Sequence, residues 1–331
     1  MKVTVIPGKV HSGAIKQVVE SIQEFGIKYN LVTNSPLIGF EGSDIAIIIG
    51  SDKDLLDVFH HIEKLNIPVL GVGEPKDGFL TEADINNFKD SLRQIMRGDY
   101  SLEEAFRLNV KIDGNDVPSA VNEAALFASR SATLVEYVLN VDGEVVWRDY
   151  SDGIIISTPI GSTAYSMSAG GPIILRNSKI FAVVSVNSLD ITRRPLIVSD
   201  DSHIKIDDIS SVRGCDLVVD GIYRSKVKER LEVFKSPDPI KLIRLPKTSN
   251  TMNQIVKKVK VAEDLLNMPP SAKLVLKTLE YEGPLTQKDI VNKTMLPGRT
   301  ARMGLTILVE KGLVARKPFL RDVRQSVYYS I

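Results

Sequence analysis

The sequence is poor in cysteine and histidine, and this limits the chemistry open to it. Its single cysteine, Cys215, excludes a disulfide framework and a cysteine-based metal site. The four histidines are scattered along the chain, and the only close pair, His60 and His61, is adjacent instead of spaced one helical turn apart. We therefore expect no zinc chemistry and identify no metal ligands.

Long apolar runs and charge of one sign are also missing. No apolar run approaches the roughly 20 residues needed to span a bilayer. The first ten residues, MKVTVIPGKV, alternate like a strand and lack the apolar core of a signal peptide. We therefore expect a cytoplasmic protein with no membrane partner. A net charge of +1 over 331 residues excludes a polyelectrolyte binder, and the length allows two or three domains.

Alternating strand and helix patterns predict an α/β domain over residues 1–102. Short β-branched runs at 2–6, 29–33, 45–49 and 68–72 alternate with amphipathic stretches at 13–25 and 54–65. That order is typical of parallel βαβ units with right-handed crossovers. A later strand and helix within 238–260 are expected to return to this domain.

Residues 103–237 have a different texture and predict a β-rich second domain. Short β-branched runs are separated by glycine, aspartate and asparagine turns, as in NVDGEVV and CDLVVDG.

The last segment, 262–331, differs again and predicts a winged helix-turn-helix domain. Helical patterns at 271–283, 286–294 and 297–312 precede two strand patterns joined by a basic turn. This segment holds 11 Lys and Arg against 7 Asp and Glu, a net charge of +4, whereas the remainder holds 31 against 34, or −3. The charge asymmetry favours a separate role for the tail.

The most informative motif is DGIIISTPIGSTAYSMSAGGPII, residues 152–174. It reads as a strand followed by a long loop of small and hydroxyl side chains. Such a loop lets a ligand approach the backbone closely and offers many neutral hydrogen bonds. A simple glycine- and serine-rich hairpin turn fits less well, because the loop is long and contains a tyrosine.

This motif resembles the glycine-rich signature of the NAD kinase family, and the resemblance extends over roughly the first 260 residues. The sequences AVNEAAL, GFLTE, VVDG and IKLIRLP match the family in the same order. The resemblance implies the family's two-domain fold, NAD or NADP as ligand, and a homodimer or homotetramer. It also implies a nucleotide site formed by Gly50, Asn122, Glu123, Asp152, Thr163, Ala164, Tyr165 and Ser168, with Asn122 and Glu123 on the adenosine half.

The stretch GSDKD, residues 50–54, stands where the family has Gly-Gly-Asp-Gly-Thr. The resemblance implies that Asp52 activates the ribose 2′-hydroxyl beside the ATP phosphates, with Mg²⁺ and ATP required if kinase activity survives. Lys53 replaces a glycine, and we expect it to crowd the phosphate path unless it serves as a phosphate-binding cation. Asp54 adds a second carboxylate, which should repel a triphosphate unless Mg²⁺ bridges the two.

Further departures from the family occur at polar positions. Ile160 stands where the family has a Thr or Ser, Ile222 replaces a Gln, and residues 73–77 differ from its Asn-x-Gly-x-Leu. Because these changes spare the dinucleotide-pocket residues, we interpret the loop as disabled for phosphate transfer and the pocket as competent for binding.

The basic tail suggests nucleic-acid contacts. Between residues 299 and 324 there are seven basic and two acidic residues. The candidate DNA-binding residues are Arg299, Thr300 and Arg302 on the third helix and Arg316, Lys317, Arg321 and Arg324 around the wing. A solvated charged surface or a protein-binding winged helix are the alternatives.

These patterns lead to two hypotheses about the function. Our main hypothesis is a DNA-binding transcriptional regulator whose degenerate NAD kinase-like domain senses NAD(P) or a related nucleotide, so that we lean against an enzyme. The alternative is an active NAD kinase, which phosphorylates NAD to NADP with ATP and carries an appended winged-helix domain.

Overall fold

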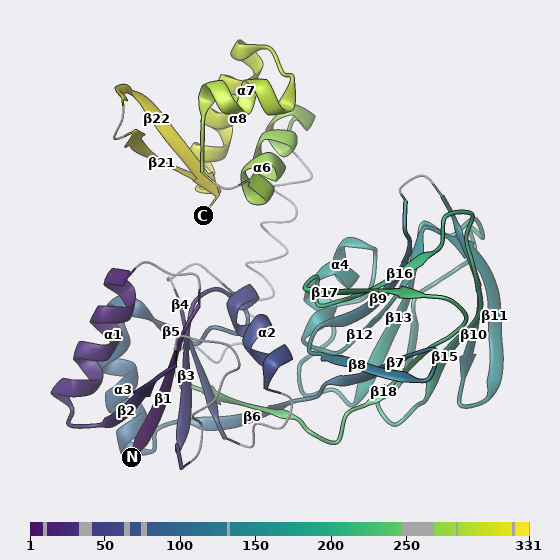
Figure 1. Ribbon diagram of the computed structural model, residues 1–331, viewed down its shortest axis with the longest axis horizontal. Helices are drawn as coiled ribbons and strands as arrows, with labels where there is room; N and C mark the ends of the chain where they lie inside the picture. The colour runs from purple at the N-terminus through teal and green to yellow at the C-terminus, as the bar shows by residue number, and fades with distance from the viewer. Residues whose placement is uncertain are drawn as a thin grey trace. The chain divides into compact units, whose positions relative to one another are not determined.

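The computed structural model describes residues 1–8, 12–32, 42–62, 67–73, 78–130, 133–246, 268–282, 284–319 and 322–330. The chain divides into two compact units, Met1–Thr251 and Met252–Ile331, and each is described by itself (Figure 1).

The first part of unit 1 is an α/β layer around a seven-stranded sheet. Its elements are β1 (Lys2–Pro7), α1 (Ser12–Glu24), β2 (Lys28–Leu31), β3 (Ile45–Ile49), α2 (Asp52–His61), β4 (Val69–Gly73), β5 (Ala83–Asp84), the 3₁₀ helix η1 (Ile85–Asn87), α3 (Phe88–Arg97), β6 (Ser101–Ala105) and β19 (Ile240–Arg244). The strand order is β2-β1-β3-β4-β19-β6, with β5 beside β4. The first four strands and β19 are parallel, and β6 is antiparallel. The predicted parallel α/β arrangement is confirmed.

Helices cover both faces of this sheet. Val18 and Ile22 of α1 and Phe88 of α3 pack on one face, whereas Leu55 and Phe59 of α2 pack on the other. Figure 1 shows α2 on the side of the sheet that faces the β-rich part of the unit. The fully buried, β-branched strands explain this double cover, because parallel strands bury both faces.

The second part of unit 1 consists of two six-stranded antiparallel sheets, as the sequence predicted. One has the order β11-β10-β15-β18-β7-β8 and the other β14-β13-β12-β9-β16-β17. Their bounds are β7 (Leu108–Ile112), β8 (Asn115–Ala120), β9 (Glu123–Ala128), β10 (Val135–Val141), β11 (Glu144–Ser151), β12 (Gly153–Ser157), β13 (Ile180–Val186), β14 (Leu196–Ser199), β15 (Ile204–Ser210), β16 (Cys215–Val219), β17 (Tyr223–Val227) and β18 (Leu231–Lys235).

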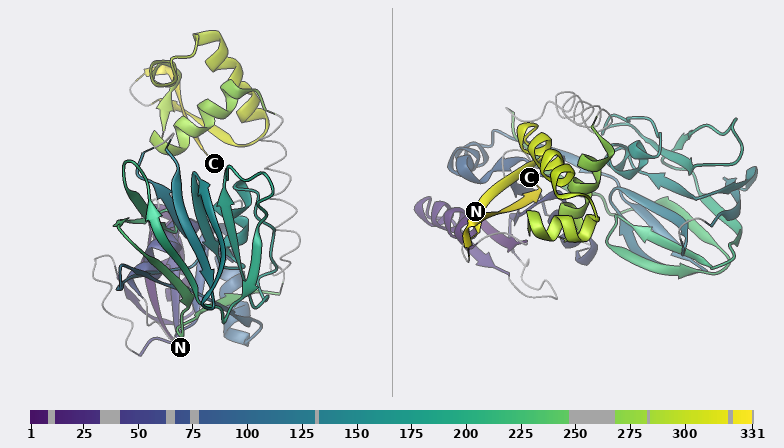
Figure 2. Two further views of the ribbon diagram at one scale, coloured as in Figure 1. Left: turned by 90° about the vertical axis from the view of Figure 1, so that its right-hand side faces the viewer. Right: turned by 90° about the horizontal axis from the view of Figure 1, so that it is seen from above.

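The two sheets pack face to face over one core (Figure 2). Leu126 and Ile156 from one sheet and Leu139 and Ile206 from the other belong to this core, and all four are fully buried. The 3₁₀ helix η2 (Gly161–Thr163) and the short α4 (Tyr165–Ser168) follow β12. The predicted small-residue loop is therefore partly helical.

Unit 2 contains three helices and a three-stranded antiparallel sheet. Its elements are α6 (Pro270–Glu282), β20 (Leu285–Thr286), α7 (Gln287–Thr294), α8 (Gly298–Glu310), β21 (Val314–Phe319) and β22 (Asp322–Ser330), with the strand order β20-β22-β21. The three helices and two strands lie where the sequence predicted them, and β20 is additional. The predicted helix at 253–261 falls outside the described residues. No helix in the described part of the chain is long and apolar enough to cross a membrane.

Candidate active site

The GSDKD stretch forms the end of β3 and the start of α2. Ser51 is the N-cap, with an extended backbone, and its hydroxyl lies 3.4 Å from the backbone N–H of Asp54. In return, Oδ2 of Asp54 accepts hydrogen bonds from the Ser51 backbone N–H at 2.8 Å and from its hydroxyl at 2.7 Å. This reciprocal capping box fixes the point at which the strand turns into the helix.

Asp52 is the first residue of α2, and its carboxylate is held by three successive backbone amides. The N–H of Phe79 donates to Oδ2 at 2.6 Å, and those of Leu80 and Thr81 donate to Oδ1 at 2.9 and 3.2 Å. A carboxylate offers about four acceptor positions. The contacts described therefore leave one position on Oδ2 for a further donor.

Gly78 makes this arrangement possible. Its φ is +111°, and a Cβ placed there would lie 2.0 Å from Oδ1 of Asp52. Only glycine combines that backbone conformation with such a close approach. The GFLT segment thus has the geometry needed to present its amides to Asp52.

Lys53 and Asp54 fit the backbone of this loop without a positive φ. Lys53 is exposed on the surface of α2, and it is absent from the positive-φ residues of the described chain. Asp54 lies in the capping box and close to Gly50 and Gly8, where an added Cβ would come within 2.6 and 2.5 Å of its carboxyl group. Glycine is therefore not required at this position, because a helical first turn accepts any side chain that points to solvent. The expected crowding of the phosphate path by Lys53 stays a prediction.

A second group of candidate residues gathers where β12 ends beside β9. The backbone N–H of Thr158 donates to the carbonyl of Asn122 at 2.9 Å, and its hydroxyl donates to the carbonyl of Val121 at 2.6 Å. A Cβ on Gly161 would lie 2.0 Å from the carbonyl oxygen of Asn122. The glycine-rich loop therefore lies directly against the Asn-Glu pair.

Asp220, which the sequence reasoning missed, holds the Asn-Glu pair from the other side. Its carboxylate accepts hydrogen bonds from the N–H groups of Val121 at 2.8 Å, Asn122 at 2.7 Å and Glu123 at 3.0 Å. Nε2 of His60 lies 2.8 Å from Oδ2 of the same carboxylate. Backbone amides carry no residue-type signature, so no sequence pattern announces this role.

The remaining predicted pocket residues differ in their exposure to solvent. Thr163 is buried, Ala164 is half-buried, and Tyr165 and Ser168 are exposed. The Tyr165 ring lies 5.6 Å from that of Phe127. The N–H of Gly50 donates to the carbonyl of Val72 in the neighbouring strand.

Asp152 lies apart from the others within one chain. It precedes β12, whereas the glycine-rich loop follows it, and the register pairs Ser157 with Glu123 but Gly153 with Phe127. Five strand residues span roughly 17 Å. The side chain of Asp152 accepts a hydrogen bond from Asn187 at 2.8 Å.

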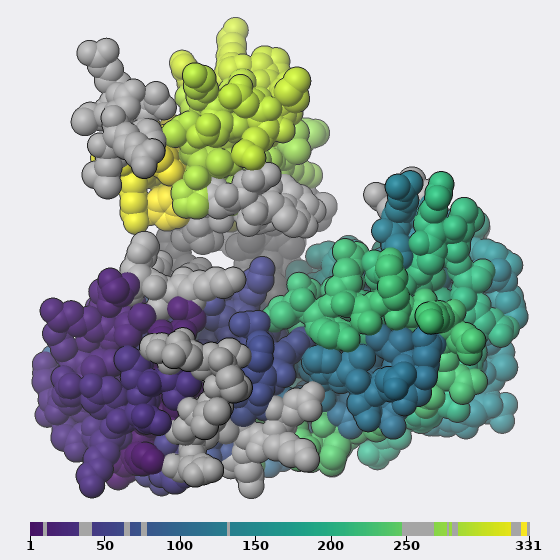
Figure 3. Space-filling model, in the orientation of Figure 1, coloured from purple at the N-terminus to yellow at the C-terminus, as the bar shows by residue number. Residues whose placement is uncertain are grey.

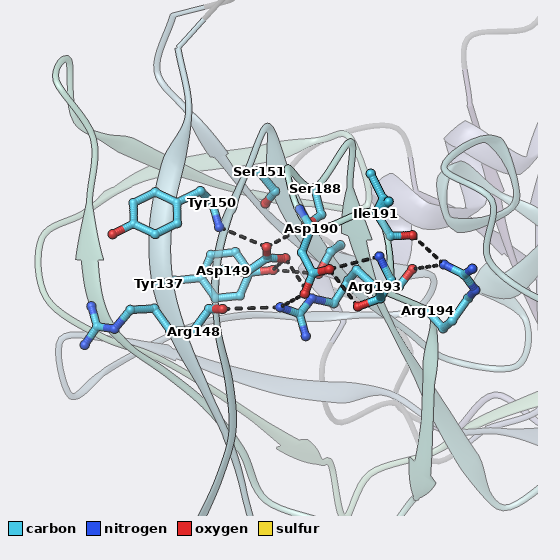
Figure 4. A network of polar contacts seen from close by, with 12 residues as sticks. Tyr137, Arg148, Asp149, Tyr150, Ser151, Ser188, Asp190, Ile191, Arg193 and Arg194 are labelled. Carbon is cyan, nitrogen blue, oxygen red and sulfur yellow. Dashed lines mark hydrogen bonds and ion pairs between the residues drawn. The ribbon is translucent and has the colours of Figure 1, made fainter.

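A polar network occupies this distant end of the strand (Figure 4). Asp149 is buried and accepts from the hydroxyls of Tyr137 at 3.1 Å and Ser188 at 2.5 Å, and Arg193 lies 3.5 Å away, over the ring of Trp147. Burial raises the pKa of Tyr137 to about 12. The phenol is therefore protonated at neutral pH and donates to Asp149, and the bond from Ser188 ties the segment after β13 to the same carboxylate.

Two departures from the family pattern have a packing role. Ile160 is buried, and Ile222 is partly buried, in the apolar cluster that contains Leu55 and Phe59 of α2 and Val121. Their apolar side chains add to the contact between α2 and the β-rich part. These positions are therefore poor evidence for lost chemistry.

The candidate DNA-binding residues belong to unit 2. Arg299, Thr300 and Arg302 lie in the first turns of α8, and both arginines are exposed. Arg316 and Lys317 are exposed on β21, with the Lys317 ammonium 4.8 Å from the centre of the Tyr329 ring. Arg321 lies outside the described residues, and Arg324 is described only as part of β22.

Comparison with known proteins identifies two family models in the chain. The ATP-NAD kinase N-terminal domain matches residues 23–100, and the ATP-NAD kinase C-terminal domain matches residues 121–245. The NAD kinase of Methanopyrus kandleri is 36% identical over 205 residues, which are 62% of this chain and 74% of that protein. The NAD kinase of Methanothermobacter thermautotrophicus is 38% identical over 207 residues, 62% of this chain and 73% of the relative. The NAD kinase of Alcanivorax borkumensis is 33% identical over 239 residues, which are 70% of this chain and 78% of that protein.

Solved structures share the fold. The NAD kinase of Archaeoglobus fulgidus, crystallised with ATP, superposes with a TM-score of 0.68 at 24% identity, over 78% of this chain and 99% of that one. Yeast NADH kinase, crystallised with NADH, superposes with a TM-score of 0.66 at 22% identity, over 78% of this chain and 86% of that one.

These relatives overturn two of our hypotheses. The prediction of a transcriptional regulator with a degenerate kinase domain is wrong, and so is the leaning against an enzyme, because relatives of this identity and coverage are NAD kinases. The error was to take Lys53 and Asp54 as signs of a disabled loop, although both lie in an ordinary helical first turn beside Asp52. The chain belongs to the NAD kinase family.

Proposed function

We propose that this protein is an NAD kinase that transfers the γ-phosphoryl group of ATP to the 2′-hydroxyl of NAD. The hydroxyl oxygen bonds to the γ-phosphorus, and the bond from that phosphorus to the β–γ bridging oxygen breaks. Asp52 takes the hydroxyl proton, and the products are NADP and ADP. The carboxylate of Asp52, fixed by three amides with one acceptor position left, is the observation that carries this proposal.

The position of Asp52 supports the assignment of a base. It lies where the parallel strand β3 ends and α2 begins, which is where open α/β sheets bind ligands. The helix N-terminus also favours negative charge nearby, such as a transferring phosphate. Fixing the carboxylate in advance lowers the cost of aligning it with the hydroxyl.

We assign Asn122 and Glu123 to the adenosine half of NAD, with Thr163, Ala164 and Tyr165 on the rest of the dinucleotide. The contacts of Gly161 and Thr158 with the Asn122 backbone support this grouping. Asp152 lies too far along β12 to join it within one chain. We therefore infer that any role of Asp152 in the pocket requires a second copy in a homo-oligomer, which light scattering would detect.

Mg²⁺ belongs to the substrate in this proposal. No group of three or more His, Cys, Asp or Glu side chains in the described residues could hold a metal ion. Mg²⁺ commonly binds through substrate phosphates with few protein ligands. We accordingly write the donor as MgATP and derive no step through a protein-bound metal.

The C-terminal unit is proposed to be a winged helix. Its three helices and its strand order β20-β22-β21 support that identification. We assign it no role in the phosphoryl transfer, since the residues proposed for the reaction all lie in unit 1.

The test is NADP formation from NAD and MgATP by the full chain. We expect turnover, and Asp52→Asn should reduce kcat by about 100-fold or more, because the proton acceptor is lost. Asp57→Asn, on an exposed position of the same helix, should leave the rate unchanged. A folded wild-type chain that binds both substrates and forms no NADP would contradict the proposal.

A further inference from the structure

One helix connects the two halves of the proposed site. Asp52 is the first residue of α2, and His60 lies in its last turn, eight residues or roughly 12 Å along the helix axis. The His60 side chain is only 5% exposed, and its Nε2 lies 2.8 Å from Oδ2 of Asp220, which is fully buried. Because an ionised carboxylate only accepts, Nε2 is the donor.

Asp220 also bonds to the backbone of the Asn-Glu pair. Its two oxygens accept the backbone N–H groups of residues 121–123, and its own N–H donates to the carbonyl of Glu123 at 3.0 Å. Its φ of +51° belongs to the tight turn between β16 and β17. The His60 bond is the fourth on this carboxylate, and the only one of the four that comes from the α/β part of unit 1.

The end of α2 makes a second set of hydrogen bonds with the β-rich part. Arg107, which is buried just before β7, donates to the carbonyls of Phe59 at 3.2 Å and Ile62 at 3.1 Å. Val121 and Ile160 lie in the same apolar cluster as Leu55 and Phe59 of α2 and complete the junction. In Figure 3 the blue-violet surface of α2 lies against the teal surface of the β-rich part. The helix therefore has little freedom to shift relative to residues 121–123.

We propose that His60 is a positioning residue for the NAD side of the reaction. By bonding to Asp220 it fixes the backbone of Asn122 and Glu123 relative to Asp52, at the other end of the same helix. This inference rests on the proposed function, in which that pair binds NAD and Asp52 accepts its proton. The substrate hydroxyl then meets a base whose distance from the binding residues is set by α2.

The kinetics for NAD and for MgATP should respond differently to loss of the His60 donor. Loss of the His60 donor loosens the NAD subsite and misaligns the hydroxyl, so that KM for NAD rises and kcat falls. The contacts of Asp52 with residues 79–81 do not involve His60, so the MgATP side should be spared. General damage to the fold would affect both substrates.

The experiment compares His60→Phe, which keeps a ring without the donor, with His60→Gln, whose Nε2 can reach the same acceptor. We expect His60→Phe to lower kcat/KM for NAD by roughly 10-fold to 100-fold, the usual effect of removing a hydrogen bond to a charged group. His60→Gln should recover most of this loss. His61→Leu, on the exposed neighbour whose ring bonds to the carbonyl of Asp57, is the matched control and should behave like wild type.

Calorimetric titration of NAD without ATP gives a readout that does not require turnover. We expect weaker binding in His60→Phe and near-normal binding in His60→Gln. If wild type binds NAD but forms no NADP, the proposed function fails while this titration still tests His60. If His60→Phe does not fold, His60→Ala with and without added imidazole takes its place, and rescue of NAD binding by imidazole is the supporting result.

Three results would overturn the inference. They are unchanged NAD kinetics and binding in His60→Phe, equal losses in His60→Phe and His60→Gln, and equal changes in KM for NAD and for MgATP.

Discussion

Two carboxylates in unit 1 are held in the same way but face different surroundings. Asp52 accepts the amides of residues 79–81, and Asp220 accepts those of residues 121–123. Asp52 is partly exposed at the sheet edge, with one acceptor position left, whereas Asp220 is fully buried and bonds to His60. In our proposal, the same kind of amide cradle positions a base at Asp52 and stabilises the fold at Asp220. The two carboxylates differ in their fourth partner and in their access to solvent.

The largest expected effect comes from a substitution that disturbs the amides around Asp52 and leaves Asp52 itself unsubstituted. Gly78→Ala would place a methyl group 2.0 Å from Oδ1 of Asp52, at a φ of +111°. The carboxylate or the GFLT backbone must move, and we expect kcat for NADP formation to fall about 100-fold. Gly13→Ala is the control, because an added Cβ there meets no atom within 4 Å, and its activity should be unchanged.

Asp220 should show the opposite profile, with stability as the main loss. Asp220→Asn replaces one acceptor oxygen by an NH₂ group that faces N–H donors. Leaving buried donors unpaired should lower the free energy of unfolding by about 3 kcal/mol, as urea denaturation would measure.

Asp201→Asn provides the contrast for that measurement. Its carboxylate is 87% exposed and 4.0 Å from Lys235, so we expect almost no change in stability. Equal stability of the Asp220 and Asp201 variants would contradict the architectural role of Asp220.

A smaller effect should follow from Asp54, which lies beside Asp52 but has a capping role. Asp54→Ala removes the bonds to the Ser51 N–H and hydroxyl, and we expect the free energy of unfolding to fall by about 1 kcal/mol. Lys53→Ala, on the exposed side of the same turn, should leave stability unchanged. A large gain in activity for Asp54→Ala would instead restore the idea that this carboxylate repels the triphosphate.

The smallest effect concerns a third carboxylate with an amide cradle, this time at the surface. Burial acts to raise the pKa of Asp113, but hydrogen bonds from the amides of Arg230, Glu229 and Lys228 outweigh it and lower the pKa below 3.8. The stability that this adds is present above pH 3.8 and is lost as the pH falls through the lower folded value. Thermal melts of wild type and Asp113→Asn should therefore converge in acid and differ slightly at neutral pH, and a constant difference would count against this account.

Much of the fold could be read from local patterns. The β-branched run Ile45–Ile49 is a fully buried strand, and the amphipathic pattern after it is α2. The three helices of unit 2 also begin and end close to the predicted residues. These features follow from periodicity and capping, which depend on neighbours in the sequence.

The sequence reasoning failed where residue type was read as function. Asp54 suggested a disabled loop, and the structure shows that it belongs to the capping box of α2. Ile160 suggested a lost hydrogen bond, and it lies in the apolar cluster that contains residues of α2. The role of each residue depends on its contacts in the folded chain, which the local sequence does not show.

The sequence alone determined the strands, the helices and the presence of Asp52, Asn122 and Glu123. Only the tertiary structure decided that Asp52 meets amides 27 to 29 positions away, and that Asp220 meets amides 97 to 99 positions away and His60 160 positions away. The reason is physical. Nearly every residue carries the same backbone N–H, so which amides converge on a carboxylate is set by the packing of distant elements.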